Sequence, residues 1–239
     1  MRATASLLSA ATLVTLAGAV TWGADATSAG RREAQAALKE FGGLVGDWRG
    51  SAQVERGKTK GAWQEDASWA WKLTADSAAL EGKITRGKYL KSLLVKPGDK
   101  AHTYTAEAVL PDGTTRSFSG KAAAKKALLL TADQAGGDGV KRITLTPLHD
   151  TRLLLLLEGQ DLDKDFTRLG EVGYTRKGVA FAAGESGPVC IVTEGRGTMP
   201  VSYKGKTYYV CCSGCKDLFN ENPEAILAEA AEREKAKKK

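Results

Sequence analysis

Between residues 46 and 176 the chain is a succession of short runs rich in β-branched, aromatic and leucine residues. In one run Trp69, Trp71 and Leu73 occupy alternate positions, so their side chains share one face of a strand. The run 153–157 is leucine throughout, as in a strand that is covered on both faces. Ten strands are predicted, over residues 47–54, 62–73, 79–85, 89–95, 103–110, 114–119, 127–132, 141–146, 152–158 and 166–175.

Turn-forming residues separate these runs, among them Lys96-Pro97-Gly98-Asp99 and Pro111-Asp112-Gly113. Strands that follow one another at such short intervals pair as an antiparallel meander. A sheet of this kind with one apolar face removes its exposed edges by closing into a barrel. The sequence therefore predicts a mainly β protein, in which an antiparallel barrel of about ten strands is followed by a small α+β module.

Gly46-Asp47-Trp48 stands at the start of the first predicted strand, shortly after a short helix predicted over residues 28–40. This G-x-W resembles the opening of lipocalin-like and fatty-acid-binding-like barrels, and the resemblance extends over residues 41–176. It implies that the tryptophan closes one end of the barrel. It also implies a small apolar ligand or a partner for the barrel, although the motif identifies neither.

The C-terminal segment has a different pattern, in which two β-prone runs precede two short helical segments. Residues 201–203 and 206–210 predict a hairpin, because the glycine of Lys204-Gly205 permits a tight turn with positive φ. A short helix is expected to open at Cys215. A second helix is expected at Asn222-Pro223, where a capping residue precedes a first-turn proline.

All four cysteines of the chain lie in this region, in the pattern C-x20-C-C-x2-C. The predicted hairpin ends at Cys211 and the predicted helix opens at Cys215, so both elements bring thiols to one place. Thiolate sulfur binds zinc and copper(I) strongly. The cluster therefore predicts a soft-metal site, with candidate ligands Cys190, Cys211, Cys212 and Cys215.

The residues around the cysteines carry a more specific resemblance. Gly187-Pro188-Val189-Cys190, the segment 201–215, Phe219 and Asn222-Pro223-Glu224 together resemble a YHS domain of the wider TRASH group. These are small treble-clef-like modules implicated in handling or sensing heavy metals, and the resemblance covers residues 187–228. It implies cysteine ligands spaced C-x19-22-C-x3-C, a spacing that Cys190, Cys211 and Cys215 satisfy, with Cys212 as an additional thiol.

The number of ligands is open at this point. A full treble clef has two ligands on each of two knuckles, whereas the first knuckle here has Cys190 alone, with Thr193 three positions on. A closed four-thiolate site would have to use the adjacent Cys211 and Cys212 together. Three thiolates with an open or non-cysteine fourth position are favoured, and such a site suits copper(I) as well as zinc.

The first residues predict export. Arg2 precedes an apolar stretch over residues 7–20, and Ala24-Asp25-Ala26 is an A-x-A-like cleavage site. Residues 1–26 are therefore interpreted as a signal peptide of a periplasmic or secreted protein. The apolar stretch is short for a stable membrane span, which needs about twenty residues.

Export also raises an alternative for the thiols, because cysteines in an oxidising compartment often form disulfides. Bridging the neighbours Cys211 and Cys212 would strain the peptide between them, whereas a bridge from Cys190 to Cys215 would be a credible staple. The competing function is an exported thiol-disulfide redox protein that uses Cys212 and Cys215 as a C-x-x-C pair at a helix N-terminus. A purely structural metal is a third alternative.

Composition and charge exclude other classes of function. The formal charge is +7, but several of the positive charges lie in the last residues, and no basic stripe with interleaved aromatics accompanies them. We therefore expect no nucleic-acid partner and a frayed, solubilising tail. No nucleophile elbow, phosphate-binding glycine loop or H-E-x-x-H is present, and with only two histidines the protein is not expected to be an enzyme.

These observations divide the chain into six segments. Small residues after Lys177 predict a linker that tethers the metal module loosely. The predicted segments are a signal peptide (1–26), a short helix (28–40), a lipocalin-like β-barrel domain (41–177), a linker (178–187), a YHS/TRASH-like metal-binding domain (188–230) and a charged tail (231–239).

Overall fold

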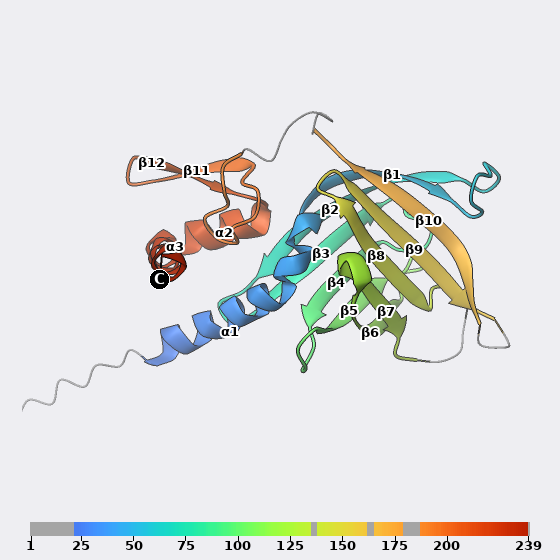
Figure 1. The fold of residues 1–239 in the computed structure, drawn as a ribbon, viewed down its shortest axis with the longest axis horizontal. Coiled ribbons are helices and arrows are strands. Elements are labelled where there is room, and N and C mark those ends of the chain that lie inside the picture. The colour runs from blue at the N-terminus through green and yellow to red at the C-terminus, as the bar shows by residue number, and fades with distance from the viewer. Residues whose placement is uncertain (1–21, 135–137, 162–164, 179–186, 239) are drawn as a thin grey trace, which may run out of the picture.

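A closed antiparallel barrel makes up most of the computed structural model, which describes residues 22–134, 138–161, 165–178 and 187–238 (Figure 1). Each strand pairs with its sequence neighbours, and β1 pairs with β10 to close the sheet. The prediction of an antiparallel barrel of about ten strands is confirmed. The strands are β1 (Gly46–Gln53), β2 (Trp63–Leu73), β3 (Ala78–Thr85), β4 (Ser92–Pro97), β5 (Thr103–Val109), β6 (Thr115–Ala123), β7 (Ala127–Ala132), β8 (Arg142–His149), β9 (Arg152–Gln160) and β10 (Phe166–Arg176).

The inward positions of the strands form the core of the barrel. On β2 the buried residues alternate along the strand, and Trp69 and Trp71 are both buried, as the sequence pattern predicts. Glu65 shares this buried face. Its side-chain oxygens accept hydrogen bonds from the Trp63 indole N–H at 2.7 Å and from the Tyr174 hydroxyl, so this buried polar group has partners.

One end of the barrel is closed by η1 (Lys39–Leu44) together with Trp48. Phe41 and Leu44 lie three positions apart on this 3-10 turn, and both are buried. The Trp48 indole N–H donates to the Leu44 carbonyl at 2.8 Å, and the Arg176 guanidinium lies 4.2 Å from the centre of its ring. The tryptophan of the G-x-W sequence thus closes the barrel end.

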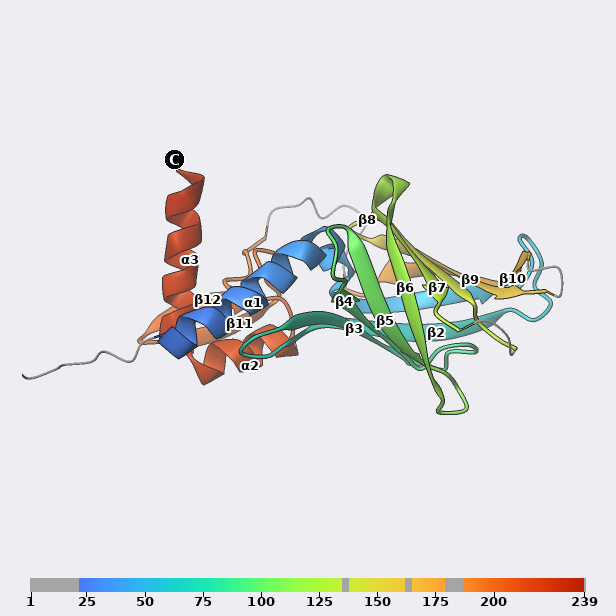
Figure 2. The same ribbon diagram turned by 90° about the horizontal axis from the view of Figure 1, so that it is seen from below.

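The helix α1 (Trp22–Leu38) connects this barrel end to the C-terminal module (Figures 1 and 2). On the barrel side, the Tyr104 hydroxyl lies 3.2 Å from the Ala37 carbonyl and 2.6 Å from the Glu40 carboxylate, which accept its hydrogen bond. On the module side, Arg31 forms a buried ion pair of 2.6 Å with Glu229. Together with η1, the helical segment extends past both ends of the helix predicted over residues 28–40. It begins at Trp22, within the predicted signal peptide, and η1 continues it to Leu44, where its apolar residues are buried in the barrel end.

The C-terminal module consists of a hairpin and two helices, as the sequence predicts. The hairpin turns at Lys204 and Gly205, whose φ angles are 47° and 75°. The side chain of Asn222 accepts a hydrogen bond from the Ala225 N–H at 3.1 Å and caps the last helix. The elements are β11 (Met199–Tyr203), β12 (Lys206–Val210), α2 (Ser213–Glu221) and α3 (Pro223–Lys237).

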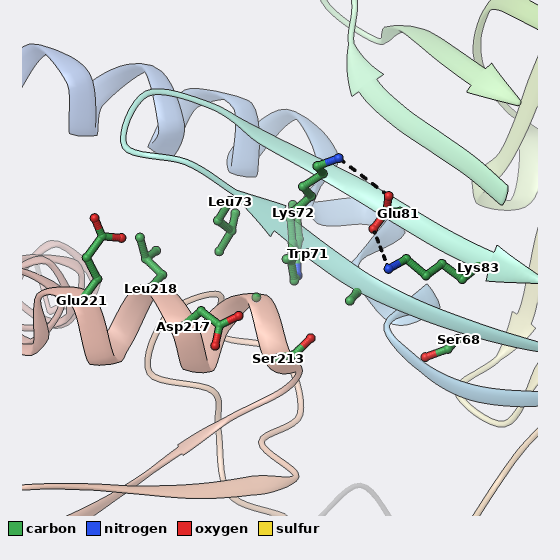
Figure 3. A pocket seen from close by; sticks show the side chains of 12 residues that line it. Ser68, Trp71, Lys72, Leu73, Glu81, Lys83, Ser213, Asp217, Leu218 and Glu221 are labelled. Carbon is green, nitrogen blue, oxygen red and sulfur yellow. Dashed lines mark ion pairs between the residues drawn. The ribbon is translucent and has the colours of Figure 1, made fainter. Parts of the chain in front are cut away.

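The module packs directly against the barrel through the N-terminal turn of α2. The last β1–β2 pair is Gly46 with Trp69, so the end of β2 extends past β1 and has a free edge. There the Trp71 N–H donates to the Cys212 sulfur at 3.3 Å. Figure 3 shows α2 beside β2 and β3, near the ion pairs that Glu81 makes with Lys72 and Lys83. This packing differs from the loose tether predicted from the small residues of the linker.

The two ends of the chain and the linker were also assigned from the sequence. Residues 1–21 of the predicted signal peptide and 179–186 of the predicted linker lie outside the described residues. The charged run expected as a frayed tail instead continues α3 to Lys237. Part of the reason is that Arg233 donates to the Ile191 carbonyl at 2.6 Å, which holds this helix against the module. No helix within the described ranges is long and apolar enough to span a membrane.

Replacing Trp48 with alanine is expected to lower the free energy of unfolding by about 3–5 kcal/mol, because it opens a cavity at the closed barrel end and removes the indole hydrogen bond. Urea unfolding followed by circular dichroism measures this change. Leu148→Ala, at a side chain that is 47% exposed, is the control and should stay within about 0.5 kcal/mol of the unmodified protein. A loss of less than about 1 kcal/mol for Trp48→Ala would contradict the role of the tryptophan.

Replacing Gly214 with alanine is expected to separate α2 from β2. A Cβ at this position would lie 1.8 Å from the Trp71 carbonyl oxygen, although alanine favours the helix itself by about 1 kcal/mol. Hydrogen exchange should therefore become faster at the Trp71 amide while the interior strands of the barrel keep their protection. Gly43→Ala, where nothing lies within 4 Å of the added methyl group, should leave exchange at the Trp71 amide and in the interior strands unchanged. Unaltered exchange at Trp71 in Gly214→Ala would show that this contact is not tight.

Candidate metal centre

A short loop with a defined hydrogen-bond pattern positions Cys190. Val189 forms a β-bridge with Arg196, and the Cys190 N–H donates to the Gly195 carbonyl at 2.7 Å. The loop is tied to β12 by the Ile191 N–H, which donates to the Tyr209 carbonyl at 2.8 Å. This loop is the first knuckle, and it directs the Cys190 side chain into the module, where it is fully buried.

The other three cysteines lie where β12 passes into α2. Cys211 follows β12 directly, Cys212 is the N-cap residue of α2, and Cys215 lies in its first turn. The N-terminus of a helix carries a partial positive charge, which favours thiolate over thiol at nearby sulfurs. The hairpin and the helix therefore bring their thiols to one point, as the sequence predicts.

The structure brings the sulfurs of Cys190, Cys211 and Cys215 within 4.8 Å of one another. The sulfurs of Cys211 and Cys215 are 3.5 Å apart. Four sulfurs around a zinc ion at about 2.3 Å would stand about 3.8 Å from one another, so this spacing fits thiolates that share one soft ion. All four cysteines are free thiols.

Cys212 lies beside this group of three. Its sulfur is 3.7 Å from that of Cys215 and 3.9 Å from that of Cys211, but it does not belong to the mutually close group. It also accepts the hydrogen bond from the Trp71 N–H of the barrel. The neighbouring thiol is therefore within reach of the cluster and in contact with β2.

Thr193 lies where a treble clef would have a second ligand on the first knuckle. Its hydroxyl oxygen is 3.4 Å from the Cys211 sulfur. A hydroxyl is a poor ligand for a soft ion, but it can hydrogen-bond to a thiolate and hold it in place. In place of a second ligand, the first knuckle thus has a hydroxyl group that can hold the Cys211 sulfur in position.

The thiols influence one another's ionisation. Hydrogen bonds from Cys211 and Cys215 lower the pKa of Cys190, and hydrogen bonds from the same two residues lower the pKa of Cys212. The hydrogen bond with Cys190 is the main cause that raises the pKa of Cys211 and of Cys215. The ionisation of each thiol is thus coupled to that of its neighbours, and a bound cation would relieve the cost of ionising the thiols whose pKa is raised.

A cleft of about 1130 Å³ lies between the barrel end and the module, and we call it the interdomain cleft. Cys211 and Cys212 lie on its wall together with Trp69 and Trp71, whereas Cys190 and Cys215 do not. Cys211 is half-buried, and the other three cysteines are buried. The sulfur cluster is therefore most accessible from this cleft, on the side of Cys211.

Charged residues of three elements meet at Glu194, which also lines the interdomain cleft. Its carboxylate is 3.0 Å from the Lys39 amine of η1, and it pairs with Arg233 at 3.7 Å and Lys237 at 2.7 Å on α3. Hydrogen bonds from Lys237 and Lys39 lower the pKa of Glu194. This residue therefore joins the first knuckle to the barrel end and to α3.

Sequence reasoning did not find the contact between Trp71 and Cys212 or the interdomain cleft. The contact uses a backbone N–H, which any residue other than proline supplies, so no side-chain pattern marks it. The only available signal was the length of the predicted strand 62–73, which exceeds that of its predicted partner 47–54.

Comparisons with known proteins identify the C-terminal module. The model of the YHS domain matches residues 192–228, a range that contains Cys211, Cys212 and Cys215 and begins two residues after Cys190. A search of curated proteins finds no match.

Among solved structures, Rv2717c from M. tuberculosis is similar at 14% sequence identity and a TM-score of 0.41. The similarity covers 59% of this chain and 97% of that one. Along the chain, the closed ten-stranded antiparallel barrel is followed by a cysteine-bearing module that matches the YHS domain over residues 192–228.

Proposed function

We propose that this protein is an exported binding protein that captures or senses a soft metal ion, zinc or copper(I). The ion is held by Cys190, Cys211 and Cys215, with Cys212 assisting or exchanging beside them. The observation that carries the proposal is the approach of three cysteine sulfurs within 4.8 Å of one another, in a module that matches the YHS domain. Thiolate donors at this spacing select soft or borderline ions over magnesium or calcium.

The chain's own residues would hold the ligands in place. The first knuckle fixes Cys190 through the hydrogen bond to Gly195, and the first turn of α2 fixes Cys215. The Thr193 hydroxyl and the Trp71 N–H lie against the sulfurs of Cys211 and Cys212. A bound ion would supply a cross-link between the first knuckle and the β12–α2 junction, which otherwise share only hydrogen bonds and packing.

Access to the cluster favours capture or sensing over a purely structural ion. A structural zinc site is closed by four protein ligands, whereas three thiolates leave a fourth position open. In this chain the half-buried Cys211 lies at the interdomain cleft, which provides a route for exchange. The barrel would hold a protein partner or a small apolar ligand, and the protein would neither catalyse a reaction nor bind nucleic acid.

Export rests on the first 26 residues. The apolar stretch 7–20 and Ala24-Asp25-Ala26 support a cleaved signal and a periplasmic or secreted location. In that compartment the thiols must bind metal in competition with oxidation.

The metal assignment predicts one ion per chain in anaerobically purified protein. Cys190→Ser and Cys215→Ser should each abolish stoichiometric binding, because two thiolates remain of a three-thiolate set. Cys212→Ser should keep the stoichiometry and weaken affinity by no more than about tenfold, as expected for a supporting group. Elemental analysis after metal loading measures the result.

Ser213→Ala, at an exposed residue of the same junction, is the matched control and should bind like the unmodified protein. Loss of the ion in Cys212→Ser as complete as in Cys215→Ser would overturn the three-thiolate assignment. Absence of metal from the unmodified protein would overturn the proposed function itself.

The geometry also supports a second candidate function, thiol-disulfide exchange. Cys212 and Cys215 form a C-x-x-C pair at the N-terminus of α2, and their sulfurs are 3.7 Å apart. Oxidation by a two-electron oxidant would remove two protons and two electrons and leave one disulfide.

Thiol counting alongside elemental analysis separates the two functions. Four reactive thiols in metal-free protein, and protected thiols with one ion in loaded protein, support metal binding. Two disulfides in protein that binds no metal would support redox chemistry and contradict the metal site.

A further inference from the structure

The wall of the interdomain cleft is rich in positive charge. Six arginine and lysine residues line it against three acidic residues, Asp47, Asp150 and Glu194. The basic residues come from α1, η1, the end of β10 and the C-terminal module. They are Arg32, Lys39, Arg176, Lys177, Arg196 and Arg233.

Two of these cations have no acidic partner among the residues that the structure describes. Lys39 and Arg233 pair with Glu194, Lys177 pairs with Asp66, and Arg32 lies 3.6 Å from Glu229. Within the described ranges, no ion pair is formed by the other two, Arg176 and Arg196.

Of these two, Arg196 is free to meet a ligand. The Arg176 guanidinium is engaged by three backbone carbonyls, those of Gly43, Val45 and Asp150. Arg196 is exposed and has no hydrogen-bond partner in the described part of the chain. Burial is the main cause that lowers the pKa of Arg176. The charge of Asp150 raises this pKa and the charge of Arg196 lowers it, so the two arginines act on the same space beside an acidic residue.

The cleft also has an unsatisfied hydrogen-bond donor. The side-chain amide nitrogen of Gln35 on α1 is buried and has no partner among the described residues, and Gln35 lines the cleft. Buried donors without an acceptor are uncommon, because each costs about 1–3 kcal/mol. Rotation of this half-buried side chain toward the cleft would let the amide donate to an oxygen-rich ligand.

We propose that the interdomain cleft binds a small polycarboxylate anion and presents its soft-metal chelate to Cys211. The planar guanidinium of Arg196 matches the geometry of a carboxylate, and the Gln35 amide can donate to a second one. The cleft of about 1130 Å³ accommodates a small organic anion, and the half-buried Cys211 is the accessible thiol of the cluster. The chelate part of this inference rests on the proposed metal function, whereas binding of the free anion does not.

The transfer step is a ligand exchange without a change of oxidation state. The Cys211 sulfur forms a bond to the metal ion, one metal–carboxylate bond breaks, and the thiol proton passes to the released carboxylate or to solvent. Repetition at the remaining thiols moves the ion into the cluster and frees the polycarboxylate anion.

Isothermal titration calorimetry of the full chain with metal-free citrate tests the anion site. Arg196→Glu is expected to weaken citrate binding by about tenfold or more, because it reverses a charge at the ligand. Lys206→Glu makes the same change of charge at an exposed residue of the same module that does not line the cleft, and its affinity should stay within about twofold of the unmodified protein. Gln35→Leu should also weaken binding, by a few-fold, without a change in charge.

Zinc transfer from zinc citrate, compared with transfer from a zinc salt at the same free zinc concentration, tests the chelate. Arg196→Glu should slow transfer from zinc citrate about tenfold, and it should not slow transfer from the zinc salt. Absence of citrate binding to the unmodified protein, or equal effects of Arg196→Glu and Lys206→Glu, would overturn the anion site. Citrate binding in a protein that takes up no zinc would support the anion site and contradict the proposed metal function.

Discussion

The free edge at the end of β2 is the constraint on which the arrangement of the molecule depends. β2 continues past its last pair with β1, so the N–H of Trp71 has no strand partner on that side. A buried backbone donor without an acceptor is costly, and the sulfur of Cys212 supplies the acceptor. The absence of a side chain at Gly214 lets α2 approach the Trp71 carbonyl closely enough for this contact. The cysteine module therefore supplies the hydrogen-bond acceptor that the barrel edge lacks, and the barrel edge supplies the surface on which α2 packs.

The position of the candidate metal centre follows from this docking. Because α2 begins at the barrel edge, Cys211 and Cys212 face the barrel, whereas Cys190 and Cys215 are buried inside the module. The interdomain cleft, with its excess of arginine and lysine, forms beside the contact. A module on a loose tether would have the same sulfur cluster, but it would lack the wall that the barrel end contributes.

The sequence predicts those features that depend on side-chain type and spacing. Alternation such as that of Trp69 and Trp71 identified the strands, and the spacing of Cys190, Cys211 and Cys215 identified the sulfurs that the structure brings together. Contacts through the backbone, such as the Trp71 N–H, leave no such pattern. The charged end of the chain resembled a tail because its composition is polar. The residues Glu229 and Arg233, which hold α3 to α1 and to the first knuckle, do not differ in type from those around them.

Ion pairs at Glu194 also attach the module to the barrel end. Three cations from η1 and α3 converge on its single carboxylate, at a site that is only partly shielded from solvent. Charge interactions of this kind weaken as dissolved ions accumulate around them, whereas the packing of α2 against β2 does not. The attachment of the module therefore combines the partly exposed pairs at Glu194, which respond to ionic strength, with buried contacts such as the packing of α2 against β2, which respond much less. At high ionic strength the pairs at Glu194 would contribute less to the attachment of the module, and the packing of α2 against β2 would contribute a larger share.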